Sequence, residues 1–344
     1  MRITFLCPHV RIAGGVRAIL SHADRLARRG HDVTLVVPAP GRLSARWRAV
    51  TRQRPRWMPG LRARIRWVAR WEAPRTPEAD ILVATAWQSA AVVAEAPTRC
   101  GAKFYLVQHY ESLYHGRPEA VDATYRLPLR KIVISTWLGD VMRERFGQPA
   151  EVIVTPVDPA LFRPVPVAVA TGRPRVLMLH HQYEWKGVAD GLAAAGRARR
   201  RVGGLHLVGF GVKRPRGVIP YDEFHANPPQ ERLAALYSSA DVYLCASWDE
   251  GLGMPSMEAM ACGAALVTYD NGGCRDYAKH GETALVARRR DIVDLGDQLE
   301  RVASDAALRA KLATAGRDFV RATFDWEEAA RRMEATFAEA RRDG

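Results

Sequence analysis

Residues 241–263 read DVYLCASWDEGLGMPSMEAMACG, and this stretch decides the fold. Its first residues form an apolar run typical of a buried strand, and a turn containing two glycines follows. Pro255 fits the first turn of a helix, where a missing N–H group costs nothing. Glu250 is then expected at the turn, beyond the carboxyl end of the strand, and Glu258 inside the helix. The free amides at the helix start suit an anionic phosphate, and the Glu258 carboxylate can accept hydrogen bonds from two ribose hydroxyls.

The same alternation of strand and helix extends outward in both directions. Strands are predicted at 2–7, 33–37, 81–85, 104–108, 131–135, 152–155, 176–179, 205–208, 242–246 and 265–268. Helices are predicted at 16–29 and from about residue 188, and a terminal helix is predicted to begin at a capping Asp325. Continuous apolar strands separated by helices indicate a parallel, doubly wound α/β sheet.

A proline-rich stretch divides the chain into two such regions. Prolines 156, 159, 164, 166 and 174 crowd together, and the strand–helix alternation restarts after them. We therefore expect two Rossmann-like domains, with a linker near residue 160.

Composition narrows the class of protein. The 344 residues are 48% apolar and 26% charged, which excludes an intrinsically disordered chain. The five cysteines show no disulfide or zinc spacing, so a reducing environment is expected. No run is long and apolar enough for a membrane-spanning helix, and the N-terminus does not resemble a secretory signal. A cytoplasmic location is the expectation.

The net charge of +14 is concentrated in residues 42–75. This segment holds eleven arginines, one acid (Glu72) and four of the nine tryptophans. Leu61, Ile65, Val68 and nearby tryptophans recur at helical spacing, which predicts an amphipathic helix on an anionic membrane surface. A phosphorylated or lipid-linked acceptor, nucleic acid, or simple packing on the first domain are the alternatives.

The spacing of Glu250 and Glu258, followed by Asn271-Gly272-Gly273, resembles the retaining GT-B glycosyltransferases of family 4, the group 1 glycosyl transferases. Further landmarks lie in the family's order: Gly14-Gly15, His109, Val157-Asp158 with Phe162, Lys186-Gly187 and the segment 324–327. The run VQHYE at 107–111, with TYR at 124–126, resembles a rhamnosyltransferase-like branch.

The resemblance implies a GT-B fold of two Rossmann-like domains that face each other across a cleft. It places an acceptor domain at 1–165, a nucleotide-sugar domain at 166–322 and a helix at 323–344 that crosses back to the first domain. It implies transfer from a nucleoside-diphosphate sugar with retention at the anomeric carbon, in cell-surface glycan or glycolipid assembly.

Site roles follow from the same resemblance. Glu250, His109 and Lys186 would be catalytic. The donor would be bound by Gly14, Gly15, Lys186, His181, Gly251, Leu252, Gly253 and Glu258. No metal or other cofactor is expected, because protein groups would neutralise the diphosphate and no Asp-x-Asp motif is present. The leaving phosphate itself would accept the acceptor's proton, while the protein positions the substrates and stabilises charge.

Two departures from the family pattern concern the donor. His181 stands where the family usually has an arginine, and Thr155-Pro156 replaces an Asn-Gly pair. A neutral histidine carries less charge than an arginine, so Lys186 and backbone amides would make more of the contacts to the diphosphate. Arg17 is a candidate for the missing cation.

The sequence is also compatible with other functions. The alternatives are a transferase for small-molecule acceptors, an epimerase or phosphorylase of the same architecture, and an inactive transferase-like fold. From another class, a non-enzymatic protein could bind nucleic acid or membrane through residues 42–75.

Overall fold

The computed structural model describes residues 1–51, 53–168, 172–215, 217 and 220–342. The chain forms two compact units, Met1–Thr155 with Trp326–Gly344, and Pro156–Asp325. The expectation of a parallel α/β architecture with two Rossmann-like domains is confirmed.

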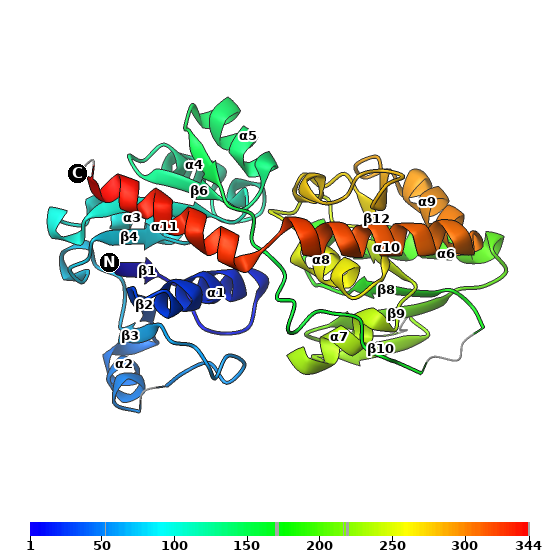
Figure 1. The fold of residues 1–344 in the computed structure, drawn as a ribbon, viewed down its shortest axis with the longest axis horizontal. Helices are drawn as coiled ribbons and strands as arrows, with labels where there is room; N and C mark the ends of the chain where they lie inside the picture. Colours follow the sequence, from blue (N-terminus) through cyan, green and yellow to red (C-terminus); the bar gives the residue numbers. More distant parts are fainter. Residues whose placement is uncertain (52, 169–171, 216, 218–219, 343–344) are drawn as a thin grey trace. The chain divides into compact units, whose positions relative to one another are not determined.

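The first unit is built on a seven-stranded parallel sheet with the order β3-β2-β1-β4-β5-β6-β7 (Figure 1). Its strands are β1 (Arg2–Leu6), β2 (Asp32–Pro38), β3 (Arg64–Val68), β4 (Ile81–Ala84), β5 (Ala102–Val107), β6 (Arg130–Val133) and β7 (Ala150–Val152). The inner strands are buried on both faces, which explains their continuous apolar runs.

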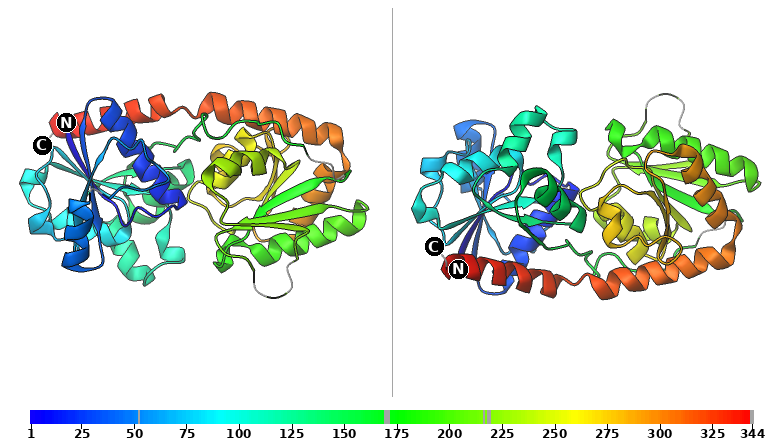
Figure 2. Two further views of the ribbon diagram at one scale, coloured as in Figure 1. Left: turned by 90° about the horizontal axis from the view of Figure 1, so that it is seen from below. Right: turned by 90° about the horizontal axis from the view of Figure 1, so that it is seen from above.

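Helices cover both faces of this sheet. They are α1 (Gly14–Arg28), α2 (Gly41–Val50), α3 (Trp87–Glu95), α4 (Pro118–Tyr125), α5 (Thr136–Phe146) and α11 (Trp326–Arg342). Figure 2 shows α11, in red, beside α1 in the first unit. The α11 helix also packs on β5, where the rings of Phe337 and Phe104 meet edge to face at 4.8 Å.

The second unit holds a six-stranded parallel sheet with the order β10-β9-β8-β11-β12-β13. Its strands are β8 (Arg175–Leu179), β9 (His206–Gly211), β10 (Glu223–Ala226), β11 (Val242–Cys245), β12 (Ala265–Tyr269) and β13 (Ala284–Ala287). Its helices are α6 (Val188–Arg201), α7 (Gln230–Ser238), α8 (Met254–Ala261), α9 (Ile292–Ser304) and α10 (Ala306–Thr323). The apolar core lies between the sheet and these helices.

One secondary-structure prediction is wrong. Residues 61–71 do not form an amphipathic helix, because 64–68 form the edge strand β3, paired with β2. Arg64 and Arg66 are exposed, whereas Ile65 between them is half-buried and Trp67 after them is buried, which is the two-residue period of a strand. Strands β10 and β13 were also not predicted.

The division of the chain differs in detail from the expected boundaries at 165 and 322. Residues 156–165 belong to the second unit, where Phe162 is buried with its ring 6.0 Å from that of Tyr237. Residues 323–325 also belong to that unit, and α11 begins at Trp326.

Neither unit contains, in its described part, a helix that is both long and apolar enough to cross a membrane. The cysteine thiols are buried and free: Cys7, Cys100, Cys245, Cys262 and Cys274.

Candidate active site

A lysine and a carboxylate meet at the carboxyl edge of the second sheet. Lys186 ends the short 3₁₀ helix η4 (Glu184–Lys186), which follows β8, and Glu250 lies in the loop between β11 and α8. Lys186 Nζ donates to Glu250 Oε1 at 2.7 Å, and the two side chains are 19% and 12% exposed. Both line a small pocket with Ser247 and Ser256. The pair is therefore accessible at the sheet edge where ligands bind in such folds.

The position of Lys186 depends on the glycine that follows it. Gly187 has a φ of 61°, and a Cβ there would lie 1.8 Å from the carbonyl oxygen of Ala246. The η4 turn thus packs directly on the end of β11, which brings Lys186 to Glu250.

The turn 251–253 leads directly into α8. Gly253 precedes the helix with a φ of 88°, and a Cβ there would lie 2.5 Å from the hydroxyl of Tyr277. The first turn of α8 holds Pro255, no acidic residue and no side-chain cap. Gly251, Leu252 and Gly253 are buried. The local backbone dipole therefore favours an anion at this helix start.

Glu258 lies on the buried side of α8. Glu258 is 2% exposed. Its Oε2 accepts a hydrogen bond from the Tyr237 hydroxyl at 3.0 Å. A buried carboxylate is stable only with such partners. Tyr237 was not predicted as a site residue.

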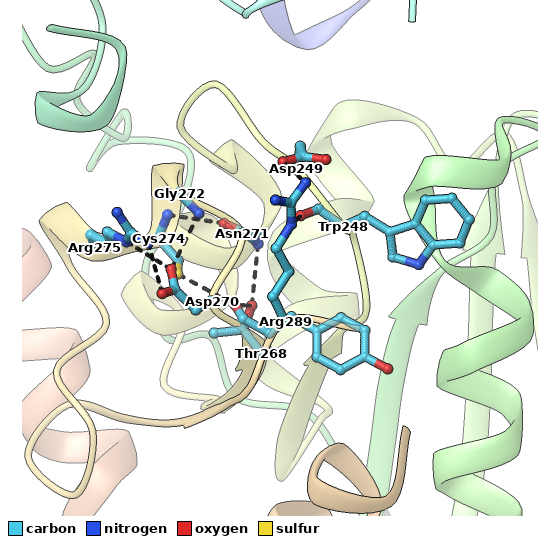
Figure 3. Close-up of polar contacts among 10 residues, drawn as sticks. Trp248, Asp249, Thr268, Asp270, Asn271, Gly272, Cys274, Arg275 and Arg289 are labelled. Carbon is cyan, nitrogen blue, oxygen red and sulfur yellow. Dashed lines mark hydrogen bonds and ion pairs between the residues drawn. The ribbon is translucent and has the colours of Figure 1, made fainter. Parts of the chain in front are cut away.

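Glu250 contacts the loop after β12, and Figure 3 shows the hydrogen bonds within that loop. Asn271 is 1% exposed; its Nδ2 donates to Thr268 Oγ1 at 3.3 Å, and its Oδ1 accepts from the Cys274 amide at 3.0 Å. The Asn271 carbonyl accepts from the Glu250 amide at 2.9 Å. Asn271 thus links the end of β12 to the backbone of Glu250.

Two further contacts fix the loop between β11 and α8, which contains Glu250. A Cβ on Gly273 would lie 2.7 Å from the backbone nitrogen of Leu252, so only glycine permits this approach. Arg289 holds Asp249 at 2.5 Å and the Trp248 carbonyl at 3.2 Å, on the residues directly before Glu250 (Figure 3). The sequence motif contained Gly273, but nothing in it indicated Arg289.

His181 lies after β8, near Lys186. Its Nδ1 accepts a hydrogen bond from the Tyr183 amide at 3.1 Å, which leaves the proton of the neutral ring on Nε2. Burial, and then the charge of Lys186, lower the pKa of His181. His180 instead contacts the Tyr221 hydroxyl at 3.0 Å. The two adjacent histidines therefore have different partners, and His181 offers a neutral N–H donor.

The remaining predicted residues lie in the first unit. Gly14 and Gly15 begin α1 and are exposed. A Cβ on Gly15 would lie 3.3 Å from Gln108 Oε1, so the start of α1 is close to the end of β5. His109 follows Gln108, with its ring 6.0 Å from that of Tyr114. These residues share the carboxyl edge of the first sheet.

Among the residues that the structure describes, no group of three or more histidine, cysteine or acidic side chains could hold a metal ion.

Two family models match this chain, each over one of its halves. "Glycosyltransferase Family 4" matches residues 12–161, and "Glycosyl transferases group 1" matches residues 166–319.

The chain matches only part of the length of its curated relatives. The chain is 32% identical to the O-antigen biosynthesis protein RfbC of Myxococcus xanthus, over 92% of this chain and 25% of RfbC. It is 27% identical to a GDP-mannose-dependent α-(1-6)-phosphatidylinositol monomannoside mannosyltransferase of Mycobacterium tuberculosis, over 58% of this chain and 59% of that protein. The chain thus spans a quarter of one relative and under two thirds of the other.

Solved structures share the fold. Sucrose-phosphate synthase from Thermosynechococcus elongatus matches with a TM-score of 0.79 at 17% identity, covering 99% of both chains. HepE from Anabaena, in complex with UDP and glucose, matches with a TM-score of 0.74 at 14% identity, covering 98% of this chain and 100% of that one.

Proposed function

Because this chain belongs to the group 1 glycosyl transferases of family 4, we propose that it transfers a hexose from a nucleoside-diphosphate sugar to an acceptor, with retention of anomeric configuration. The observation that carries the proposal is the contact of Lys186 with Glu250, beside the uncapped start of α8. A cation and free amides suit a diphosphate, and a carboxylate suits sugar hydroxyls. The solved structures of Anabaena HepE and of Starch Synthase IV from Arabidopsis thaliana are complexes with UDP and with ADP, which supports a nucleotide-bearing donor.

In this proposal each residue has one task. Lys186, with the amides of Gly251, Leu252 and Gly253, binds the diphosphate, and Glu250 binds hydroxyls of the transferred sugar. Glu258 binds the ribose.

The buried position of Glu258 sets a condition on that last contact. With the residue 2% exposed, a ribose reaches its carboxylate only if neighbouring side chains move. The hydrogen bond from Tyr237 orients the carboxylate for this role.

The remaining tasks fall to His181 and the first unit. His181 adds one neutral hydrogen bond from Nε2, in place of an arginine's fork. Gly14 and Gly15 permit close approach of a phosphate, and His109 contacts the sugar.

The proposed reaction assigns a step to each of these groups. The acceptor hydroxyl attacks the anomeric carbon on the side from which the diphosphate departs, and the leaving phosphate oxygen takes the hydroxyl proton. Lys186 and the backbone amides stabilise the negative charge that develops on the diphosphate. No metal or other cofactor takes part in this scheme, because protein groups supply the positive charge.

We further propose that the chain acts in surface-glycan assembly, because its relative RfbC is named for O-antigen biosynthesis. We also propose that it works at an anionic membrane surface, because of the side chains that α2 exposes. Leu43, Trp47 and Val50 lie at helical spacing on α2 and are 85%, 60% and 76% exposed. Exposed arginines flank this apolar stripe. An apolar face bordered by arginine suits the interface of an anionic bilayer.

Vesicle sedimentation tests the membrane contact. The chain should bind phosphatidylglycerol vesicles, and Trp47→Ser should weaken binding more than Ser44→Ala, a change on the half-buried side of α2. Equal binding to phosphatidylcholine vesicles would contradict the proposal.

Proton NMR of donor turnover tests the transfer. The chain is incubated with UDP-, GDP-, dTDP- and ADP-sugars and candidate acceptors, and the coupling constant of the new anomeric proton is measured. A retaining transferase gives a product whose sugar has the same anomeric configuration as in the donor. The opposite configuration would refute the proposal. Lys186→Ala should lose turnover, whereas Lys311→Ala, an exposed position on α10, should keep it.

A further inference from the structure

A second pocket lies at the carboxyl ends of β1, β2 and β3 in the first unit. It has a volume of about 550 Å³ and is large enough for a monosaccharide. Most of its polar and aromatic lining comes from the basic segment 42–75: Arg42, Arg66, Trp67, Arg70, Trp71 and Arg75, with Glu72. The pocket thus gathers part of the basic segment 42–75 at the same sheet edge as Gly15 and His109.

The arginines of this pocket outnumber its acid. Glu72 pairs with Arg70 at 2.7 Å and with Arg75 at 3.1 Å, and its own pKa is lowered, first by the hydrogen bond from Arg70. Glu72 forms its ion pairs with Arg70 and Arg75, and neither Arg42 nor Arg66 has an ion pair among the described residues. The lining thus holds four arginines and one acid; Arg42 acts on Glu72 only through its charge, and Arg42 and Arg66 are available to a ligand.

The two tryptophans of the pocket are held in place. Trp71 Nε1 donates to the Val36 carbonyl at 3.0 Å, and Trp67 Nε1 donates to the Gln53 carbonyl at 3.3 Å. The guanidinium of Arg48 lies 4.9 Å from the centroid of the Trp67 ring. Fixed aromatic walls lose little entropy when a ring-shaped ligand binds.

We propose that this pocket binds an anionic group, a phosphate or a carboxylate, on the sugar or lipid acceptor. Guanidinium groups match these anions with paired hydrogen bonds, and the indoles provide apolar surface for the ring or chain that carries the anion. That the ligand is the acceptor rests on the proposed transferase function. The binding of an anion here does not.

The test uses fluorine NMR of the whole chain labelled with 5-fluorotryptophan. Trp67→Phe and Trp71→Phe assign the two signals from the pocket. Glucose 1-phosphate and glucuronate should shift these signals saturably, and glucose at the same concentration should not. No shift with either anion, or an equal shift with glucose, overturns the proposal.

Paired variants locate the anion. The double variant Arg42→Gln/Arg66→Gln should raise the Kd roughly tenfold or more, because it removes two charge-assisted contacts. The control Arg46→Gln/Arg64→Gln makes the same change of charge on α2 and β3, outside the pocket lining. An equal loss of affinity in both pairs would mean that net charge, not the pocket, binds the anion, and would overturn the proposal.

Two further arms identify the source of the anion and separate this inference from the proposed function. Tighter binding of monomeric dihexanoyl phosphatidic acid than of glucose 1-phosphate assigns a lipid headgroup, and the reverse order assigns a soluble sugar phosphate; either supports an anion site. In Lys186→Ala the tryptophan shifts should persist. If they persist while no nucleotide binds to the native chain, the transferase proposal fails and the anion site stands.

Discussion

Replacing Lys186 with alanine removes the cation that faces Glu250 at the carboxyl edge of the second sheet. A charge-assisted hydrogen bond to a diphosphate contributes about 1.5–3 kcal/mol, so the Kd for a nucleoside diphosphate should rise about 10- to 150-fold. The structure indicates a second loss of binding free energy, from charge repulsion. With Lys186 gone, the carboxylate of Glu250, only 12% exposed, faces the incoming diphosphate with no lysine between them.

The repulsion between Glu250 and the diphosphate can be measured in a double-variant cycle. The Lys186→Ala/Glu250→Gln chain should bind the nucleotide more tightly than Lys186→Ala alone, by about 1 kcal/mol, because the repelling charge is removed. Isothermal titration of the four chains with the preferred nucleotide gives each Kd, and Lys311→Ala is the matched control on the exposed side of α10. An unchanged Kd in Lys186→Ala would refute the assignment of this lysine to the diphosphate.

Three further predictions concern the surroundings of the site. Glu258→Ala should weaken nucleotide binding, whereas Glu250→Ala should mainly slow transfer; titration and initial rates measure the two effects, and unchanged values in both variants would remove the basis of the site. Gly273→Ala should destabilise the second unit by about 1–3 kcal/mol, because its Cβ would overlap the backbone of Leu252; thermal unfolding measures this, and an unchanged Tm would contradict the packing argument. Burial raises the pKa of Glu111 to about 7, so stability should fall as pH rises from about 4.5 to 7, while the unfolded carboxyl ionises and the folded one keeps its proton. Glu111→Gln should remove about 2–3 kcal/mol of this pH dependence. Denaturant unfolding at pH 5 and pH 8 measures it, and an equal change in the free energy of unfolding in both chains would exclude Glu111 as its cause.

The sequence predicted the elements whose local signals agree. In residues 241–263 an apolar run, a glycine turn and a proline at a helix start indicate one arrangement, and the structure has β11, the turn and α8 there. Strand β3 was misread because its alternation of arginine and apolar residues is only four residues long within the strand, and the apolar residues Leu61, Ile65 and Val68 also fit a helical period. A short edge strand is defined by its neighbour β2 more than by its own residues.

The site was predictable only where its residues are close in sequence. Glu250 and Glu258 share one motif, and Lys186 was found through the family resemblance. Arg289 on Asp249, and Tyr237 on Glu258, are contacts between elements 40 and 21 residues apart. No local pattern encodes them, because they depend on the order of strands in the sheet. The pocket at Arg42 and Arg66 likewise required α2 and β3 to be placed together.

The binding of a nucleoside diphosphate by the second unit is tested most directly by thermal unfolding with UDP, GDP, dTDP and ADP, in the native chain and in Lys186→Ala. At about a hundred times its Kd, a bound nucleotide adds about 2.7 kcal/mol. For domains of this size that raises the Tm by about 5–10 °C. We predict this shift for one base in the native chain, with a much smaller shift in Lys186→Ala. No shift with any of the four nucleotides would contradict a donor site at Lys186 and Glu250.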